Sequence, residues 1–317
     1  MLDSGLRDEA AITERLKKLV TLPAGSPVLV GIGDDCAVYR PRGSADDLLF
    51  TVDMFLEGVH FERETHKAAV AGRKALVRSL SDIAAMGGSP RFCLAALCVP
   101  AWANERWVDG FFDGILKLGA ITRTVLAGGD LAHGEKLSCD ITVCGAVPRG
   151  TALRRDGARP GHDIYVSGRL GGSALGLEKQ EGRAWRRHLQ PEPRLALGQF
   201  LRAKLRASAA IDISDGLSLD LRRLCLASGV DAEIDAPPRF RGASLEQALH
   251  GGEEYELLFT VPGGSGVPDN FEGLPLTHIG HTVRSTRGGG AVYLDSVPLP
   301  ASGYDHFRAE RTSSNKL

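Results

Sequence analysis

The residues with the clearest chemical capacity are two adjacent aspartates in a glycine-rich turn. Gly31-Ile32-Gly33 lets the backbone turn after the apolar run 28–30, and Asp34-Asp35 follow directly. Adjacent carboxylates repel each other, and beside glycines they favour hard cations, solvent or a helix N-terminus. An ordinary Gly-Asp turn is the alternative. The role of this loop therefore depends on whether other carboxylates are placed in the same way.

Further aspartates lie at predicted strand ends, beside glycines, or on the last turns of a predicted helix. They are Asp53, Asp82, Asp130, Asp212 and Asp215. Ligands bind at the strand ends of open α/β sheets, and Mg²⁺ prefers one or two carboxylates together with water and phosphate oxygens. The repeated pattern predicts a site for metal ions and a polyphosphate.

Structural roles are the alternative for each of these aspartates. Asp82 follows Arg78 by four residues, which would suit a surface ion pair, but its neighbours in 80–86 are mostly apolar. Asp53 interrupts an apolar strand, where aspartate is disfavoured. Asp130 fits a plain turn. We expect Asp215 to be the N-cap of a helix over 217–228 as well as a site residue.

Motifs of other nucleotide enzymes are missing from the sequence. It contains no GxxxxGK[ST] loop, no kinase H-R-D or D-F-G set and no GxGxxG pattern. A nucleotide would therefore be held mainly through metals and backbone amides.

Composition indicates an ordinary globular protein. The chain has 317 residues, enough for two domains, with 43% hydrophobic and 24% charged residues. A net charge of −1 argues against nonspecific nucleic-acid binding. No apolar run approaches the roughly 20 residues of a membrane span. The charged, amphipathic stretch 2–20 lacks the features of a signal peptide, so we expect a cytoplasmic protein.

The cysteines do not form a metal-binding pattern. No CxxC pair occurs, and the two pairs that lie five residues apart in predicted strands face opposite sides. We expect all six to be reduced thiols, mostly buried: Cys36, Cys93, Cys98, Cys139, Cys144 and Cys225.

Helical and strand patterns alternate along the chain, which predicts an α/β layered fold. The predicted helices are 9–20, 68–86, 102–118, a short helix after 171–172, 194–207, 217–228 and 246–250. The predicted strands are 27–32, 47–54, 92–99, 124–127, 137–147, 164–167, 209–213 and 255–261. Proline and glycine near 148–150 and 158–161 predict a boundary between domains 1–148 and 149–317.

Eight motifs occur in an order that resembles one family. They are 31–37 (GIGDDCA), 51–53 with 57–61, 80–87 (LSDIAAMG), 128–130 (GGD), 188–194, 211–216 (IDISDG), 251–257 (GGEEYEL) and 303–307 (GYDHF). Together they resemble the thiamine-monophosphate kinases over almost the whole chain. Related enzymes of the aminoimidazole ribonucleotide synthetase superfamily share the aspartates but not this whole set.

The resemblance implies ATP-dependent phosphorylation of thiamine monophosphate to thiamine diphosphate, the last step of thiamine diphosphate biosynthesis. It implies a homodimer in which the N-terminal sheets form a barrel, with a C-terminal α/β domain over it. Mg²⁺ and ATP are the implied cofactors, a K⁺ requirement stays open, and no nucleic acid or membrane is involved.

The resemblance also assigns site residues. The implied metal positions are Asp35, Thr51, Val52, Asp53, Asp82, Asp130, Asp212 and Asp215. The implied nucleotide contacts are Gly129, Asp130, Ser214 and an arginine near 154–158, for which Arg155 is favoured over Arg154. The implied thiamine contacts are His60, Glu253 and Tyr304.

Three positions depart from the family pattern without removing a carboxylate. Val52 replaces threonine, so a metal contact there must use the backbone, while Leu131 replaces threonine and Gln190 replaces arginine.

The acceptor, a phosphate monoester, is already ionised near neutral pH, so no residue is assigned as general base. The alternatives are a superfamily enzyme with a different acceptor, or a non-catalytic module that binds ATP.

Overall fold

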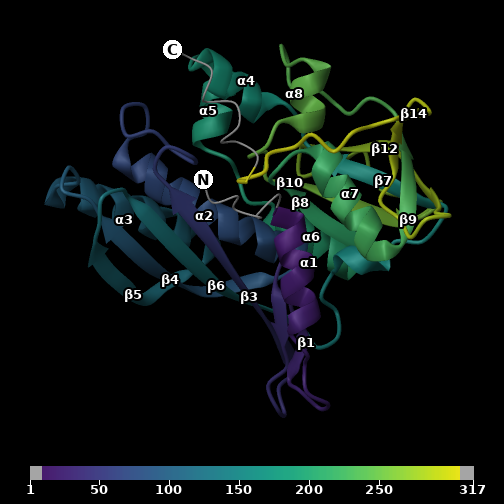
Figure 1. The fold of residues 1–317 in the computed structure, drawn as a ribbon, viewed down its shortest axis with the longest axis horizontal. Coiled ribbons are helices and arrows are strands. Elements are labelled where there is room, and N and C mark those ends of the chain that lie inside the picture. Colours follow the sequence, from purple (N-terminus) through teal and green to yellow (C-terminus); the bar gives the residue numbers. More distant parts are fainter. Residues whose placement is uncertain (1–8, 308–317) are drawn as a thin grey trace, which may run out of the picture.

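A computed structural model describes residues 9–307, which form two β-sheets with helices packed against them (Figure 1). The expectation of a mixed α/β fold is confirmed. Within the described residues, no helix combines the length and the apolar character needed to cross a bilayer.

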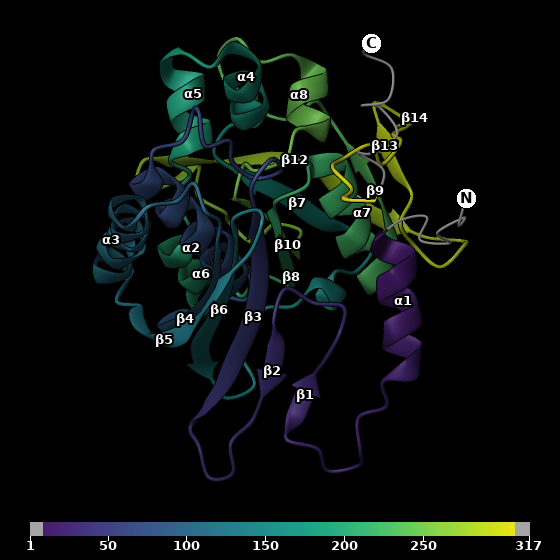
Figure 2. The same cartoon turned by 60° about the vertical axis from the view of Figure 1, so that its left-hand side comes forward.

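The first sheet contains six strands in the order β1-β2-β3-β6-β4-β5. Their bounds are β1 Val28–Val30, β2 Ala37–Tyr39, β3 Asp46–Leu56, β4 Ser89–Val99, β5 Val125–His133 and β6 Ser138–Pro148. All neighbours are antiparallel except β4 and β5. Helices α2 (Ala68–Ala85) and α3 (Glu105–Thr122) pack together and lie on the same side of this sheet (Figure 2).

The second sheet is also mainly antiparallel, in the order β14-β13-β9-β12-β7-β10-β8 with β11 beside β12. Its strands are β7 His162–Ser167, β8 Ala209–Ile213, β9 Val230–Ile234, β10 Glu256–Pro262, β11 Asn270–Phe271, β12 Leu274–Arg284, β13 Val292–Leu294 and β14 Val297–Pro298. The strands β9 and β11 to β14 escaped the sequence prediction.

The remaining helices surround the second sheet. They are α4 Gly172–Lys179, α5 Gly182–Leu189, α6 Leu195–Phe200, α7 Leu217–Ser228 and α8 Leu245–His250, with a 3₁₀ turn at Arg155–Gly157 and a π-helical turn at Leu201–Leu205. Helices α4, α5 and α8 gather at one end of the molecule, and α1 (Glu9–Leu19) stands apart near α7 (Figure 2).

Helix α2 lies between the two sheets and positions the centre of the molecule. It contacts β3 and β6 of the first sheet and β8 and β10 of the second. Its apolar residues Leu76, Leu80 and Ile83 are fully buried, and the helix ends where Gly87 takes φ 68°. Polar side chains on α2 are therefore held at the junction of both sheets.

Two strand ends were predicted wrongly. Strand β3 continues past Asp53 to Leu56, and β5 continues through Gly128-Gly129-Asp130 to His133, because both pair with their neighbours along their length. The expectation that ligands bind at the ends of parallel strands does not apply to these mainly antiparallel sheets. The site is instead built from the loop after β1, helix α2 and residues within strands β3 and β8.

Candidate metal and phosphate site

Three carboxylates from distant parts of the chain converge. Asp35 follows β1, Asp82 lies in the last turns of α2, and Asp212 lies in β8. One carboxylate oxygen from each lies within 4.8 Å of the others. The structure therefore brings these three aspartates together, and their role as metal ligands stays a prediction.

Hydroxyl and guanidinium groups orient these carboxylates. Ser81 Oγ donates a hydrogen bond of 2.6 Å to Asp212 Oδ2, and Thr51 Oγ1 donates to Asp82 Oδ2. Arg155 Nη2 donates to Asp35 Oδ1. Each carboxylate thus keeps one oxygen in a fixed position, which leaves the other oxygen for a ligand.

Burial and mutual repulsion oppose ionisation of the cluster. Burial first, and then neighbouring carboxylates, raise the pKa of Asp82 and of Asp212 well above the usual range of aspartate. Burial and the charge of Asp35 raise the pKa of Asp34 to about 7. A cation bound among these groups would favour their ionised forms.

Unpaired buried oxygens fit a metal. Within residues 9–307, Asp35 Oδ2 and Asp53 Oδ2 are buried without a hydrogen-bond partner. Buried carboxylate oxygens are costly unless they are paired or coordinate a cation. Several carboxylate oxygens this close together are suitable ligands for Mg²⁺. The residues present therefore suit the metal that the carboxylate pattern predicts.

The cluster lines a cleft of about 1060 Å³ that also carries positive charge. Arg78, Arg155 and Arg223 line it together with Ser214 and Tyr255. Arg155 is the arginine that faces the carboxylates, whereas Arg154 pairs with Asp156 at the surface. The arrangement combines cation-binding carboxylates with arginines that can contact phosphate oxygens.

Asp215 lines the same cleft, but its predicted capping role is wrong. The N-cap of α7 is Gly216, and the backbone N–H groups of Asp215 and Gly216 donate to Asp220 Oδ2 at 3.0 and 3.1 Å. The Asp215 carboxylate instead forms an ion pair with Arg223 at 2.5 Å. This pairing engages only Oδ2 of the Asp215 carboxylate.

The alternative for Asp82, a surface pair with Arg78, is also wrong. Arg78 Nη1 donates to Tyr255 Oη at 3.0 Å, and its Nη2 lies 3.6 Å from Asp53 Oδ1. Asp82 faces the carboxylate cluster. Arg78 thus holds Asp53 beside the site.

Gly129 and Asp130 lie away from the cluster within one chain. Asp130 lies on the outer strand β5 and pairs in register with Ala96 of β4. The same row of residues continues through Asp140 of β6 to Met54 of β3, which is exposed. Asp53 belongs to the neighbouring row, whose side chains face α2. A side chain at Gly129 would collide with the Ala95 carbonyl oxygen, 1.8 Å from the ideal Cβ position.

The predicted thiamine contacts come together at a second part of the site. Lys74 Nζ donates to the His60 carbonyl oxygen at 2.9 Å and lies 3.0 Å from the Glu253 carboxylate. His306 lies between His60 and Tyr304, with ring centroids 5.4 and 4.9 Å away. The C-terminal motif therefore packs over His60.

The departures from the family pattern leave the carboxylates in place. Val52 is 63% exposed on the uncovered face of the first sheet, and it also lines the cleft. Leu131 is 65% exposed on β5, and Gln190 is the C-cap of α5.

Lys74, Arg78 and His188 were missed by sequence reasoning. Lys74, Arg78 and Asp82 recur every four residues on an otherwise apolar helix, and this spacing places them on one face. Charged residues at core-facing positions of a helix are the signal that could have found them.

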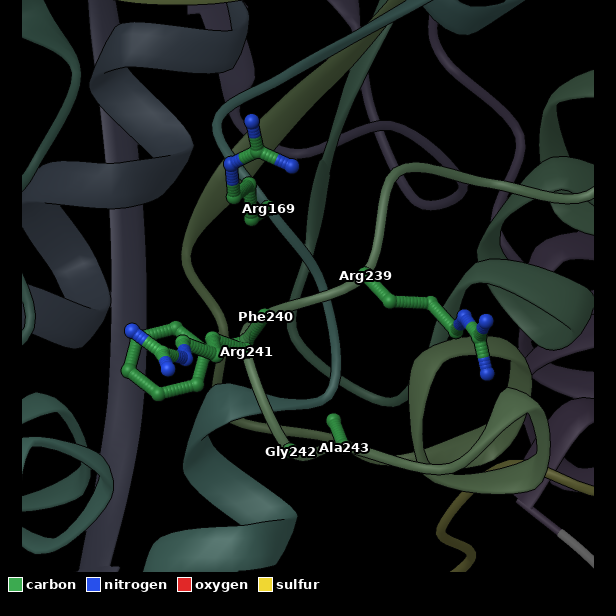
Figure 3. Close-up of a pocket in the computed structure, with 6 residues that line it drawn as sticks. All are labelled: Arg169, Arg239, Phe240, Arg241, Gly242 and Ala243. Atoms are coloured by element: carbon green, nitrogen blue, oxygen red, sulfur yellow. The ribbon is translucent and has the colours of Figure 1, made fainter.

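A second cavity, of about 530 Å³, lies in the C-terminal half and has different chemistry. Figure 3 shows its three arginines, Arg169, Arg239 and Arg241, extending in different directions. Its lining residues include no carboxylate, so this cavity is no candidate for the metal site.

The part of the chain that carries Asp35 and Asp82 is similar to the AIR synthase related proteins. The family model for the N-terminal domain of AIR synthase related proteins matches residues 33–147, which include Asp35, Asp53, Asp82 and Asp130. Structures of the hydrogenase maturation protein HypE share the fold: one in complex with ATP aligns with a TM-score of 0.67 at 16% identity, covering 86% of this chain and 89% of that chain.

Closer relatives identify the family. The chain is 39% identical over 307 residues to thiamine-monophosphate kinase of Salmonella typhimurium, covering 88% of this chain and 92% of the relative. It is 34% identical over 310 residues to the Bacillus subtilis kinase, with 89% and 95% covered. The solved structure of AaThiL complexed with AMPPCP and TMP aligns with a TM-score of 0.83 at 32% identity over 96% and 99% of the two chains. The chain belongs to the thiamine-monophosphate kinase family.

Proposed function

We propose that the chain transfers the γ-phosphoryl group of ATP to thiamine monophosphate and so forms thiamine diphosphate, the last step of its biosynthesis. The observation that carries the proposal is the convergence of Asp35, Asp82 and Asp212 from both halves of the chain within 4.8 Å. The 39% identity to a thiamine-monophosphate kinase and the likeness to a structure complexed with AMPPCP and TMP support the choice of substrates.

The residues that would hold Mg²⁺ are the three clustered aspartates and Asp53, whose buried Oδ2 has no hydrogen-bond partner within the described residues. Bound Mg²⁺ would neutralise the charges of donor and acceptor phosphates, which otherwise repel each other. Asp215 joins this set in the proposal, although its Oδ2 pairs with Arg223.

The protein groups around the carboxylates suit positioning rather than proton transfer. The acceptor phosphate is ionised near neutral pH and can attack without a general base. Arg155 and Ser214 line the cleft beside the cluster, in reach of phosphate oxygens. We assign them to the nucleotide, and His60, Glu253 and Tyr304 to thiamine monophosphate. No covalent intermediate is needed.

A homodimer forms part of the proposal, because one chain leaves Asp130 on the wrong face of its sheet. The uncovered face of the first sheet exposes apolar side chains from β3 and β4. They are Phe50 at 36%, Val52 at 63%, Met54 at 54% and Leu94 at 38% exposure. A barrel of two such sheets would cover these residues and bring Gly129 and Asp130 of each subunit toward the cleft of the other.

The proposed domain division follows the two sheets. Residues 1–148 would form the dimerisation and metal domain, since the first sheet ends at Pro148, and residues 149–317 would complete the site with Asp212 and Glu253. The ends of the two predicted domains and the start of the predicted amphipathic stretch 2–20 fall on residues 1–8 and 308–317, which lie outside the described residues.

An acceptor screen tests the proposed function. ADP release is measured with ATP, Mg²⁺ and either thiamine monophosphate or aminoimidazole precursors, and K⁺ is exchanged for Na⁺ in parallel. We expect release with thiamine monophosphate alone. Release with another acceptor would favour the rival superfamily enzyme, and ATP binding without any release would favour a non-catalytic module.

A further inference from the structure

We propose that Lys74 is a positioning residue for the acceptor substrate: its ammonium group fixes the Glu253 carboxylate and the His60 main chain as one unit. The inference deepens the proposed function and rests on it, since Glu253 and His60 are assigned there to thiamine monophosphate. Lys74 itself is assigned no role by the carboxylate pattern or by the family motifs.

Lys74 has no exposure to solvent, and its ammonium group meets three acceptors. Nζ donates to the His60 carbonyl oxygen at 2.9 Å and to Glu253 Oε2 at 3.0 Å, and it lies 3.2 Å from His188 Nε2. An ammonium group has three N–H donors. All three are used, so the orientation of the lysine is fully determined.

His188 fixes the other side of the lysine. Its Nδ1 lies 3.0 Å from Ser173 Oγ, and its Nε2 faces Lys74. Burial, followed by the charge of Lys74, lowers the pKa of His188 to about 4, so the ring is neutral near pH 7. The neutral ring accepts from Lys74 through Nε2 and donates from Nδ1 to the serine, which makes it a rigid support.

Glu253 is held under constraint by the same unit. Its backbone has φ 60°, a left-handed conformation that costs energy for a residue with a side chain, and its N–H donates to the Ser214 carbonyl oxygen at 2.7 Å. Although burial acts in the opposite direction, Lys74 and then His188 lower the pKa of Glu253 to about 2. Glu253 is therefore an anion with a fixed direction.

Both carboxylate oxygens of this anion lie close to Lys74. Oε2 accepts a hydrogen bond from Nζ at 3.0 Å, whereas Oε1 lies 3.0 Å from Nζ as an ion pair but, within the described residues, is buried without a hydrogen-bond partner. On the other side, His60 Nδ1 accepts from the Leu56 N–H at 2.9 Å, which places the proton of the neutral ring on Nε2. The unit thus presents an acceptor and a donor, a pattern that suits a ligand with both amino and ring nitrogens.

A kinetic double-variant cycle tests the role of Lys74. KM for thiamine monophosphate, KM for ATP and kcat are measured for wild type, Lys74→Met, Glu253→Gln and the double variant. Arg40→Met is the matched control, because it removes the cation from another buried carboxylate, Asp47, far from the site. We expect Lys74→Met to raise KM for thiamine monophosphate by roughly tenfold or more and to leave KM for ATP within about twofold.

The double variant keeps the test valid if Lys74→Met folds poorly, because it leaves no unpaired buried charge. If Lys74 acts through Glu253, the double variant has the same KM for thiamine monophosphate as Glu253→Gln. If the double variant raises KM for thiamine monophosphate by the product of the two single effects, the positioning role is overturned. Equal rises in KM for thiamine monophosphate and for ATP would overturn it as well. A wild-type enzyme that releases no ADP with thiamine monophosphate would instead refute the proposed function, before any variant is compared.

Discussion

Ser81 Oγ donates a hydrogen bond of 2.6 Å to Asp212 Oδ2, and this buried contact joins helix α2 to strand β8. The next residue on the helix, Asp82, brings its carboxylate to the same cluster. Two consecutive residues of α2 thus set both the direction of Asp212 and its distance from Asp82. The geometry of the metal site therefore depends on how helix α2 and strand β8 are placed relative to each other.

Removing this hydrogen bond should weaken catalysis without removing a carboxylate. We expect Ser81→Ala to lower Mg²⁺ affinity or kcat by roughly 10- to 100-fold, since groups that orient metal ligands have effects of this size. Ser79→Ala is the control: Ser79 is also buried on α2, but its Oγ donates to the Ile141 carbonyl oxygen instead. Equal activities of the two variants would show that Asp212 needs no orientation.

Replacing Asp212 itself should abolish turnover. Asp212→Asn removes a ligand charge, whereas it removes no apolar packing, and the raised pKa of this carboxyl shows that its ionised form is disfavoured in the folded metal-free protein. We therefore expect undetectable ADP release together with a Tm equal to or above that of wild type. Normal activity would contradict the metal assignment. A large fall in Tm would also contradict it, because unfolding would then explain the loss of activity.

His60 should affect one substrate more than the other. Replacement by alanine removes the Nε2–H donor and the ring that contacts Phe55 and His306, both outside the carboxylate cluster. We expect His60→Ala to raise KM for thiamine monophosphate more than KM for ATP, while His281→Ala, at an exposed position, changes neither. Equal rises in both constants would contradict the assignment of His60 to the acceptor.

Acid should destabilise the protein through buried neutral histidines. Burial, followed by the charge of Lys74, lowers the pKa of His66 to about 4. Below the unfolded pKa of about 6.5, only the unfolded state gains the proton, so stability falls from pH 7 to pH 5 by about 2 kcal/mol through this residue.

His66→Asn tests that contribution. Its side-chain oxygen can replace Nδ1, which accepts from the Glu62 N–H at 3.3 Å, but it does not titrate. Denaturant unfolding is measured at pH 7 and pH 5. Between these pH values, the free energy of unfolding of the variant should fall by about 2 kcal/mol less than that of wild type. An identical loss in both proteins would mean that His66 is protonated in the folded state.

A mixing experiment tests whether Asp130 serves the partner's site. Asp130→Asn and Asp212→Asn should each be inactive alone. In a mixed dimer, one cleft would combine an intact cluster with an intact Asp130 from the other subunit. Co-expression should then restore about a quarter of wild-type activity, since half of the dimers are mixed and each has one complete site. No recovery in verified mixed dimers would contradict the shared site.

The sequence predicted the chemistry better than the geometry. Asp35, Asp82 and Asp212 could be found because carboxylates beside glycines or in apolar segments are unusual in a core. The strand ends at Asp53 and Asp130 were wrong, because pairing with neighbouring strands, which local propensity does not report, extends β3 and β5. Register then places Asp130 on the opposite face of the sheet from Asp53.

Lys74 and His188 could not be linked by sequence, since 114 residues separate them and their contact depends on how α5 packs near α2. Of the two candidate arginines, Arg155 pairs with Asp35 and Arg154 pairs with Asp156, and the assignment of Arg155 to the nucleotide stays a prediction. Motifs therefore supply the residue types of the site, and packing between the two sheets supplies their arrangement.

The most direct test of the account follows the label from ATP carrying a marked γ-phosphoryl group. The enzyme is incubated with thiamine monophosphate, with Mg²⁺ or with a chelator, and label is measured in thiamine diphosphate and on the protein. We predict label in thiamine diphosphate only when Mg²⁺ is present, and none on the protein. Label bound covalently to the protein, or transfer that continues in the chelator, would contradict direct transfer at a magnesium site formed by Asp35, Asp82 and Asp212.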